Sequence, residues 1–211
     1  MAEHKILSSR VLRSSLRGVV ALNLAAFAGE VGVALVIGSV SLVADSVDFL
    51  EDASINLLIL VAVLWSARAR ARLGMGLAGI ILVPSLATLA MARHQFGVQT
   101  PPSPVALALT GFGALVVNGT CAWMLARHRH AGGSLMKAAF LSARNDTVAN
   151  AAIIVAGLVT AATRSAWPDL TVGAAIGLLN AGAAWEVYSA ARAEQSAPSA
   201  SELKSDRSGA T

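Results

Sequence analysis

The residues best suited to chemistry form an acidic stripe inside an apolar stretch, residues 41–58. The stripe consists of Asp45, Asp48, Glu51 and Asp52. On a helix these four side chains fall within an arc of about 120°. One carboxylate at the centre of a bilayer costs about 3 kcal/mol on insertion scales, so four ionised carboxylates would cost about 12 kcal/mol. We therefore expect these side chains to face the interior of a helix bundle or a water-filled cavity, and their charge to be neutralised by protons or by a shared cation.

The spacing of two of these acids favours a metal ion. Asp48 and Asp52 are four residues apart, which places their Cβ atoms about 5–6 Å apart on one face of a helix. Two carboxylates at that spacing can bind one divalent cation. We take this pair as the nucleus of a metal site.

The composition predicts an all-α, polytopic membrane protein. Of 211 residues, 55% are hydrophobic and 13% are charged, whereas a soluble domain has about 25% charged residues. The net charge of +4 is spread in short groups between apolar segments, which argues against nucleic acid as a partner. The single cysteine, Cys121, excludes an intrachain disulfide and a cysteine-based zinc site.

Six apolar segments are long enough to cross about 30 Å of hydrocarbon. They cover residues 18–37, 41–65, 73–91, 105–125, 137–162 and 170–190. A cleaved signal peptide ending near Ala28 is the alternative for the first segment, but the apolar stretch continues beyond that residue, which favours an uncleaved span.

The positions of Lys and Arg predict the orientation. These residues gather in the N-terminal segment, after the second and fourth apolar segments and at the start of the tail. Both termini are therefore predicted to be cytoplasmic, in an inner membrane. We expect residues 1–12 to form a cytoplasmic segment, 13–192 a six-helix transport domain and 193–211 a disordered tail. A loop is expected over residues 92–104, which end in a proline cluster.

The fifth apolar segment carries a second set of polar residues. Ser142, Asp146 and Asn150 are spaced four residues apart and share one helical face. In the six-span topology Asp146 lies at the same depth as Asp48 and Asp52. Three carboxylates at one depth on two helices predict a shared site.

Together, these patterns resemble the cation diffusion facilitator family. The resemblance covers about residues 13–192 and is carried by the first, second and fifth spans. It rests on Asn23, Phe27, Glu30, Ser41-Leu42-Val43-Ala44-Asp45, the DxxxD pair Asp48 and Asp52, Asp146 at the Asp position of an HxxxD half-site, and Trp167-Pro168-Asp169. It implies efflux of a divalent transition metal by a homodimer, with Zn²⁺ first and Co²⁺ or Cd²⁺ next.

Two features depart from the family pattern. Ser142 stands where the family has His, so the fourth ligand is left open among Ser142, Asn145, Asn150, Asp45 and water. An all-oxygen shell also favours harder ions such as Mn²⁺, Mg²⁺ or Fe²⁺. Members of the family usually continue into a cytoplasmic ferredoxin-like metal-sensing domain, which we expect this chain to lack.

The residues also suggest a mechanism. Carboxylates close together in low dielectric cannot all ionise cheaply, so protons and metal compete for the same oxygens. We therefore expect a metal/proton antiporter, without catalytic residues or a resident cofactor. The alternatives are a non-transporting metal-sensing or structural membrane protein and, ranked lower, a metal-dependent membrane enzyme, since no His lies near the stripe.

Other polar residues in the spans have structural or undecided interpretations. Asn118 and Asn180 are interpreted as hydrogen-bonding partners between helices, and Glu30 either as such a partner or as part of the transport path. Arg144 is either an ion-pair partner for Glu51 or Asp45, or a cation near the membrane interface.

Overall fold

The computed structural model describes residues 10–62, 67–128 and 133–196. This part of the chain contains six helices and no strand, which confirms the all-α prediction. The helices are α2 (Arg10–Ile37), α3 (Val40–Ala62), α4 (Ala67–Val98), α5 (Pro104–Ala126), α6 (Gly133–Thr163) and α7 (Trp167–Ser196).

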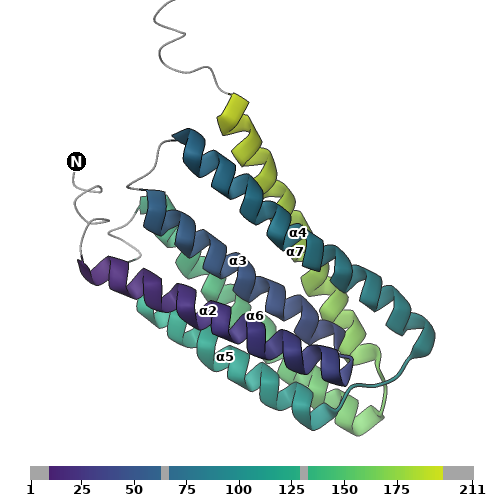
Figure 1. Cartoon of the computed structure of the whole chain (residues 1–211). Coiled ribbons are helices and arrows are strands. Elements are labelled where there is room, and N and C mark those ends of the chain that lie inside the picture. Colours follow the sequence, from purple (N-terminus) through teal and green to yellow (C-terminus); the bar gives the residue numbers. More distant parts are fainter. Residues whose placement is uncertain (1–9, 63–66, 129–132, 197–211) are drawn as a thin grey trace, which may run out of the picture.

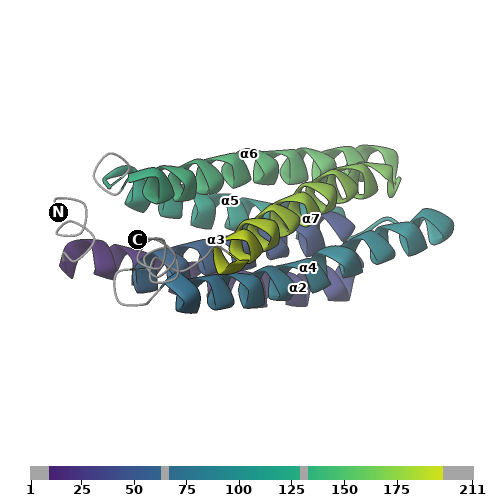
Figure 2. The ribbon, with the colours of Figure 1, turned by 90° about the horizontal axis from the view of Figure 1, so that it is seen from above.

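Helix α3 lies at the centre of an antiparallel bundle (Figures 1 and 2). It packs against each of the other five helices, whereas α2 pairs mainly with α3 and α5, and α4 pairs mainly with α7. Every residue from 39 to 49 is buried. The helix that carries the acidic stripe is therefore enclosed by protein.

The acidic stripe lies between two apolar parts of the core. One cluster, towards the ends of α3 and α5, includes Leu16, Ile59 and Leu125. The other, around the first turns of α3, includes Leu42 and Ile153. Because apolar side chains close both ends of this region, the acidic residues are held in a low-dielectric layer.

The outer surface suits a lipid environment. Four helices, α2, α4, α5 and α6, are long and apolar enough to cross a membrane by length and composition. They expose large apolar side chains, such as Val36, Val83 and Leu109, outwards. Helix α3 differs from these four helices, because it has four acidic residues within eight positions. Its burial inside the bundle keeps these residues away from lipid. The number of described helices equals the number of predicted spans, but α3 and α7 are not among the four candidate spans, so six spans stay a prediction.

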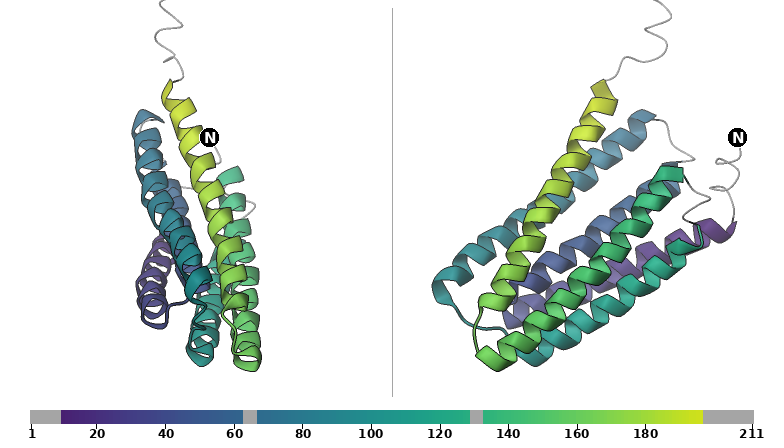
Figure 3. Two further views of the ribbon diagram at one scale, coloured as in Figure 1. Left: turned by 90° about the vertical axis from the view of Figure 1, so that its right-hand side faces the viewer. Right: turned by 180° about the vertical axis from the view of Figure 1, so that it is seen from behind.

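The described ends of the chain lie at the same end of the bundle. The start of α2, the end of α3, the start of α4, the start of α6 and the end of α7 are all found there (Figures 1 and 3). The short α2–α3 and α6–α7 connections lie at the opposite end. This arrangement agrees with termini on one membrane side; that this side is the cytoplasm stays a prediction.

The predicted loop over residues 92–104 is wrong in its first half. Helix α4 continues to Val98, and only residues 99–103 connect it to α5. Residues beyond the apolar core remain helical because they bind neighbouring helices: Gln95 Nε2 donates to the Gly38 carbonyl at 3.1 Å, and the Phe96 ring meets Trp167 edge-on at 4.7 Å.

Two helices extend past the predicted bounds of the transport domain, whose ends stay a prediction. Helix α2 begins at Arg10, inside the expected N-terminal segment, and α7 continues to Ser196, inside the expected tail. The remainder of those two segments, residues 1–9 and 197–211, lies outside the described residues.

A carboxylate from α7 caps the start of α3. The first backbone N–H groups of a helix have no partner within it. Asp169, only 2% exposed, accepts hydrogen bonds from the Ser39 hydroxyl (2.6 Å), Val40 N (2.8 Å) and Ser41 N (3.2 Å), and also from the Ser41 hydroxyl. Asp169 thus provides hydrogen-bond acceptors for the free N–H groups and a negative charge at the positive end of the helix dipole. These contacts also fix the position of α3 relative to α7.

A glycine one turn further along α7 allows the same close contact. A Cβ atom on Gly173 would lie 2.6 Å from both Ser41 N and Val40 C. Real Cβ atoms do not approach backbone atoms so closely, so this crossing of α7 and α3 requires glycine. Gly177, one turn further along α7, meets the Thr88 side chain of α4.

Gly173→Ala is therefore expected to destabilise the protein by about 1–3 kcal/mol, the usual cost of overpacking, because α7 must move away from the backbone of α3. Thermal unfolding in detergent measures the change. Gly182→Ala is the matched control on the same helix, since nothing lies within 4 Å of its Cβ position; an equal loss in both variants would contradict the close contact.

Candidate cation-binding site

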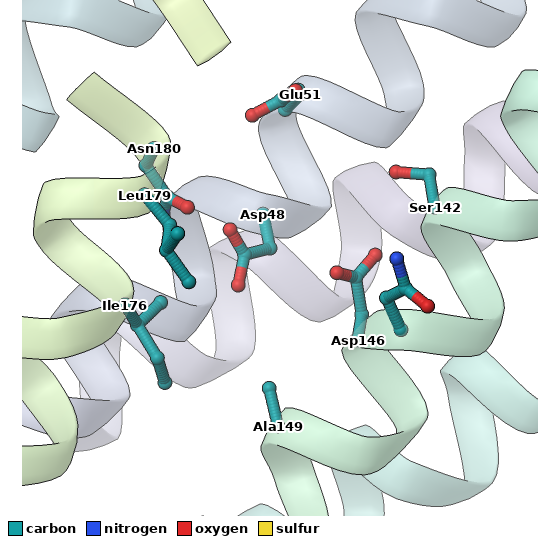
Figure 4. A pocket seen from close by; sticks show the side chains of 9 residues that line it. Asp48, Glu51, Ser142, Asp146, Ala149, Ile176, Leu179 and Asn180 are labelled. Atoms are coloured by element: carbon teal, nitrogen blue, oxygen red, sulfur yellow. The ribbon is translucent and has the colours of Figure 1, made fainter. Parts of the chain in front are cut away.

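A cavity of about 330 Å³ lies between α3, α6 and α7 (Figure 4). Its walls are formed by two acids of the stripe, one acid of α6, three neutral polar side chains and three apolar ones. The residues are Asp48, Glu51, Ser142, Asn145, Asp146, Ala149, Ile176, Leu179 and Asn180. The cavity is large enough for a hydrated cation and rich in oxygen donors.

The structure brings together acids from two helices that lie about 100 residues apart in the chain. Asp48 of α3 and Asp146 of α6 both point into the cavity, from different walls (Figure 4). Asp48 is only 8% exposed. The predicted convergence of the second and fifth spans is therefore present in the fold.

Asp52 lies beside this cavity without forming its wall. It is 1% exposed, and neither of its carboxylate oxygens has a hydrogen-bond partner. The Ser142 side chain of α6 interacts with Asp52 and also lines the cavity. Ser142 thus connects Asp52 to the cavity.

The carboxylates of the site lie further apart than one bound metal ion requires. Among the described residues, no three His, Cys, Asp or Glu side chains lie close enough together to hold one metal ion. Carboxylates without a cation between them repel one another in a low-dielectric interior.

Two other predicted ligands, Asp45 and Asn150, bind each other. Asn150 Nδ2 donates to Asp45 Oδ1 at 2.6 Å, and Asn118 Nδ2 donates to Asn150 Oδ1 at 3.5 Å. Glu30 of α2 lies beside Asp45 on the other side. This buried network joins four helices, and neither Asp45 nor Asn150 lines the cavity.

Arg144 stays at the surface. Its guanidinium donates to Asn145 Oδ1 at 3.3 Å, and within the described residues it forms no ion pair with Glu51 or Asp45. The interpretation of Arg144 as their partner is therefore wrong. The reason is geometric: Arg144 and Asp146 lie on different faces of α6, so only Asp146 faces the bundle. Asn145, a predicted ligand, does line the cavity.

Sequence reasoning missed two polar residues of the cavity wall, Glu51 and Asn180. Glu51 belongs to the acidic stripe, three positions after Asp48, and this spacing was a usable signal. Asn180 carried no such signal, because its segment contains no acid near that position and a lone asparagine is common between membrane helices.

Comparison with known families matches residues 16–193 to the cation efflux transmembrane domain. The chain belongs to this family. The match extends from α2 to α7 and thus covers all six helices and the cavity. Among curated proteins no relative matches the chain.

Membership confirms the resemblance to cation diffusion facilitators. Together with the long apolar helices, the cation efflux domain identifies the chain as a multi-pass membrane protein and points to a transporter of metal cations and not to an enzyme. The acid-lined cavity is the part of this cation efflux domain best suited to its cargo.

Asp52→Asn is expected to stabilise the metal-free protein by about 1 kcal/mol, because the neutral amide removes a buried acid without hydrogen-bond partners. Thermal unfolding in detergent, without divalent metal, measures this. Stabilisation by added metal should fall in the same variant.

Asp169→Asn is the contrasting control, since that carboxylate is fully hydrogen-bonded. It should destabilise the protein by about 2 kcal/mol. A metal-free Asp52→Asn protein that unfolds below the wild-type temperature would show that Asp52 is a structural residue.

Proposed function

We propose that this cation efflux protein exports a divalent transition metal through the cavity between α3, α6 and α7, in exchange for protons. The observation that carries the proposal is the convergence of Asp48 and Asp146 from two helices on one cavity inside the cation efflux domain. Buried acids of this kind in membrane helices are costly, and they mark ion and proton pathways.

Three acids supply the charge for the cation: Asp48, Asp52 and Asp146. Ser142 lines the same cavity and supplies a neutral oxygen, while water completes the shell. Asn145 also lines the cavity, but its Oδ1 accepts a hydrogen bond from Arg144. Asp45 and Asn150 stay outside this set, because each already binds the other.

The donor set consists of oxygen atoms, which bears on the choice of ion. Zn²⁺ comes first from the resemblance to cation diffusion facilitators, followed by Co²⁺ and Cd²⁺. Carboxylate, hydroxyl and amide oxygens are also the donors that Mn²⁺ accepts readily, and Fe²⁺ fits the same shell. A direct comparison of Zn²⁺ and Mn²⁺ uptake decides between the two groups.

Proton exchange follows from the environment of the acids. Asp52 has no hydrogen-bond partner for its carboxylate oxygens, and no positively charged side chain lines the described cavity. Buried carboxylates without a counter-charge bind either protons or a cation. Metal binding therefore displaces protons, and protons returning from the outside release the metal.

In the proposed topology the protein spans the inner membrane six times, and both termini lie on the cytoplasmic side. The support for this topology is the common end of the described chain termini (Figure 3) and the excess of Lys and Arg in the segments at that end. Assembly as a homodimer stays a prediction from the family resemblance.

Asp52→Ala and Asp146→Ala are each expected to lower metal uptake into inside-out vesicles by about 100-fold, since each removes a charged ligand. Reconstituted protein and radioactive or fluorescent metal detection provide the measurement. Thr163→Ala, an exposed change near the end of α6, is the control. Wild-type rates in both acid variants would remove the assignment of the site, and absence of flux in the wild type would favour the non-transporting alternative.

Metal binding is expected to release at least one proton per cation, because metal and protons compete for the same carboxylates. A pH indicator in weakly buffered detergent solution measures the release, and the apparent metal affinity should fall as the pH falls. The double variant Asp48→Asn and Asp146→Asn should release fewer protons. Tight binding without proton release would refute exchange and leave metal transport without proton coupling.

A further inference from the structure

The wall of the cavity formed by α7 contains one strongly oriented polar group. Asn180 is 5% exposed, and its Nδ2 donates to the Ala44 backbone carbonyl on α3 at 3.0 Å. Since the nitrogen is held by this carbonyl, the amide oxygen must face the other way. It points into the cavity, towards Asp48 (Figure 4), and no described residue donates a hydrogen bond to it.

Glu51 lies on the same side of the cavity. It follows Asp48 by three residues on α3 and lines the cavity with it. In Figure 4 Asn180 lies beside Asp48, Glu51 lies one turn further along α3, and Asp146 and Ser142 lie on the α6 side of the cavity. The cavity thus has two groups of oxygen donors, and Asp48 lies between them.

The chemistry of the first group suits a divalent cation held loosely. Two carboxylates and one amide carbonyl are typical oxygen ligands for such ions, and water fills the remaining positions. A neutral amide binds more weakly than a third carboxylate. Weak binding is what a transient position on an ion path requires, because the ion must leave again.

We propose that Asp48, Glu51 and Asn180 form a loading position for the transported divalent cation, separate from the position served by Asp52 and Asp146. This inference rests on the proposed function. Glu51 lies further than Asp48 towards the C-terminal end of α3, which is the predicted cytoplasmic end. The cation arrives there and then moves across the cavity, exchanging the oxygens of Glu51 and Asn180 for those of Asp146 and Asp52 while Asp48 holds it throughout.

A purely structural role for Asn180 is the competing explanation, because its amide also ties α7 to α3 through Ala44. Loss of that hydrogen bond would lower stability in any variant at this position. It would not change which metal the protein prefers. The preference between metals therefore separates the two roles.

Asn180→His is the decisive variant. An imidazole nitrogen favours Zn²⁺ over Mn²⁺ relative to an amide oxygen, so the ratio of Zn²⁺ to Mn²⁺ affinity should rise by about tenfold, the scale of one altered ligand. Equilibrium binding of each metal to purified protein in nanodiscs measures this ratio. Asn23→Leu, which removes a buried amide on α2 that does not line the cavity, should leave the ratio unchanged.

Glu51→Gln provides a second, independent test, since Glu51 is only half-buried and the variant retains its shape. Loss of a ligand used for loading should raise KM for metal uptake by about tenfold while kcat changes little. Asp146→Ala, by contrast, should lower uptake by about 100-fold at any metal concentration.

An unchanged metal preference in Asn180→His together with an unchanged KM in Glu51→Gln would overturn the loading position. If Asp146→Ala still lowered uptake as expected in that case, the proposed function would stand without it. A wild-type protein that bound both metals but moved neither would instead overturn the proposed function. If Asn180→His failed to fold, the KM of Glu51→Gln would decide.

Discussion

Burial of carboxylates away from water is the constraint on which this structure depends. Exposing four ionised side chains of α3 to lipid would cost a large free energy. In the structure α3 is surrounded by five helices. Two apolar clusters close the ends of this polar layer. The charge of α3 therefore explains its position at the centre of the bundle. Beside α3 lies a cavity in which these acids can bind a cation.

The buried carboxylates differ in the hydrogen-bond donors that surround them. Asp169 is fully hydrogen-bonded by the start of α3, and Asp45 is held by Asn150; both stabilise contacts between helices. Asp48 and Asp52 have no comparable donors and lie in or beside the cavity. Asp169 thus belongs to the scaffold, and Asp45 is held through one oxygen only, since its Oδ2 atom has no hydrogen-bond partner. The acids in or beside the cavity have oxygens available for protons or a cation.

Helix α7 has two roles in this arrangement. Through Asp169 and Gly173 it packs directly on the first turn of α3, which sets the rotation of the acidic stripe. Through Asn180 it forms one wall of the cavity. Both contacts involve α3, so α7 links the first turn of α3 to the wall of the cavity.

The sequence by itself determined the helical class, the number of helices and the family, since apolar length, charge distribution and the spacing of acids are properties of single segments. It also placed Asp146 at the depth of Asp48, because depth follows from position along a span. Only the tertiary structure decided that Asp45 pairs with Asn150, that Arg144 faces outwards, that α4 continues through residues 92–98, and that Glu51 and Asn180 line the cavity. Periodicity gives the face of a helix but not the neighbour that covers it. That neighbour depends on contacts between distant segments, such as Gly173 against Ser41.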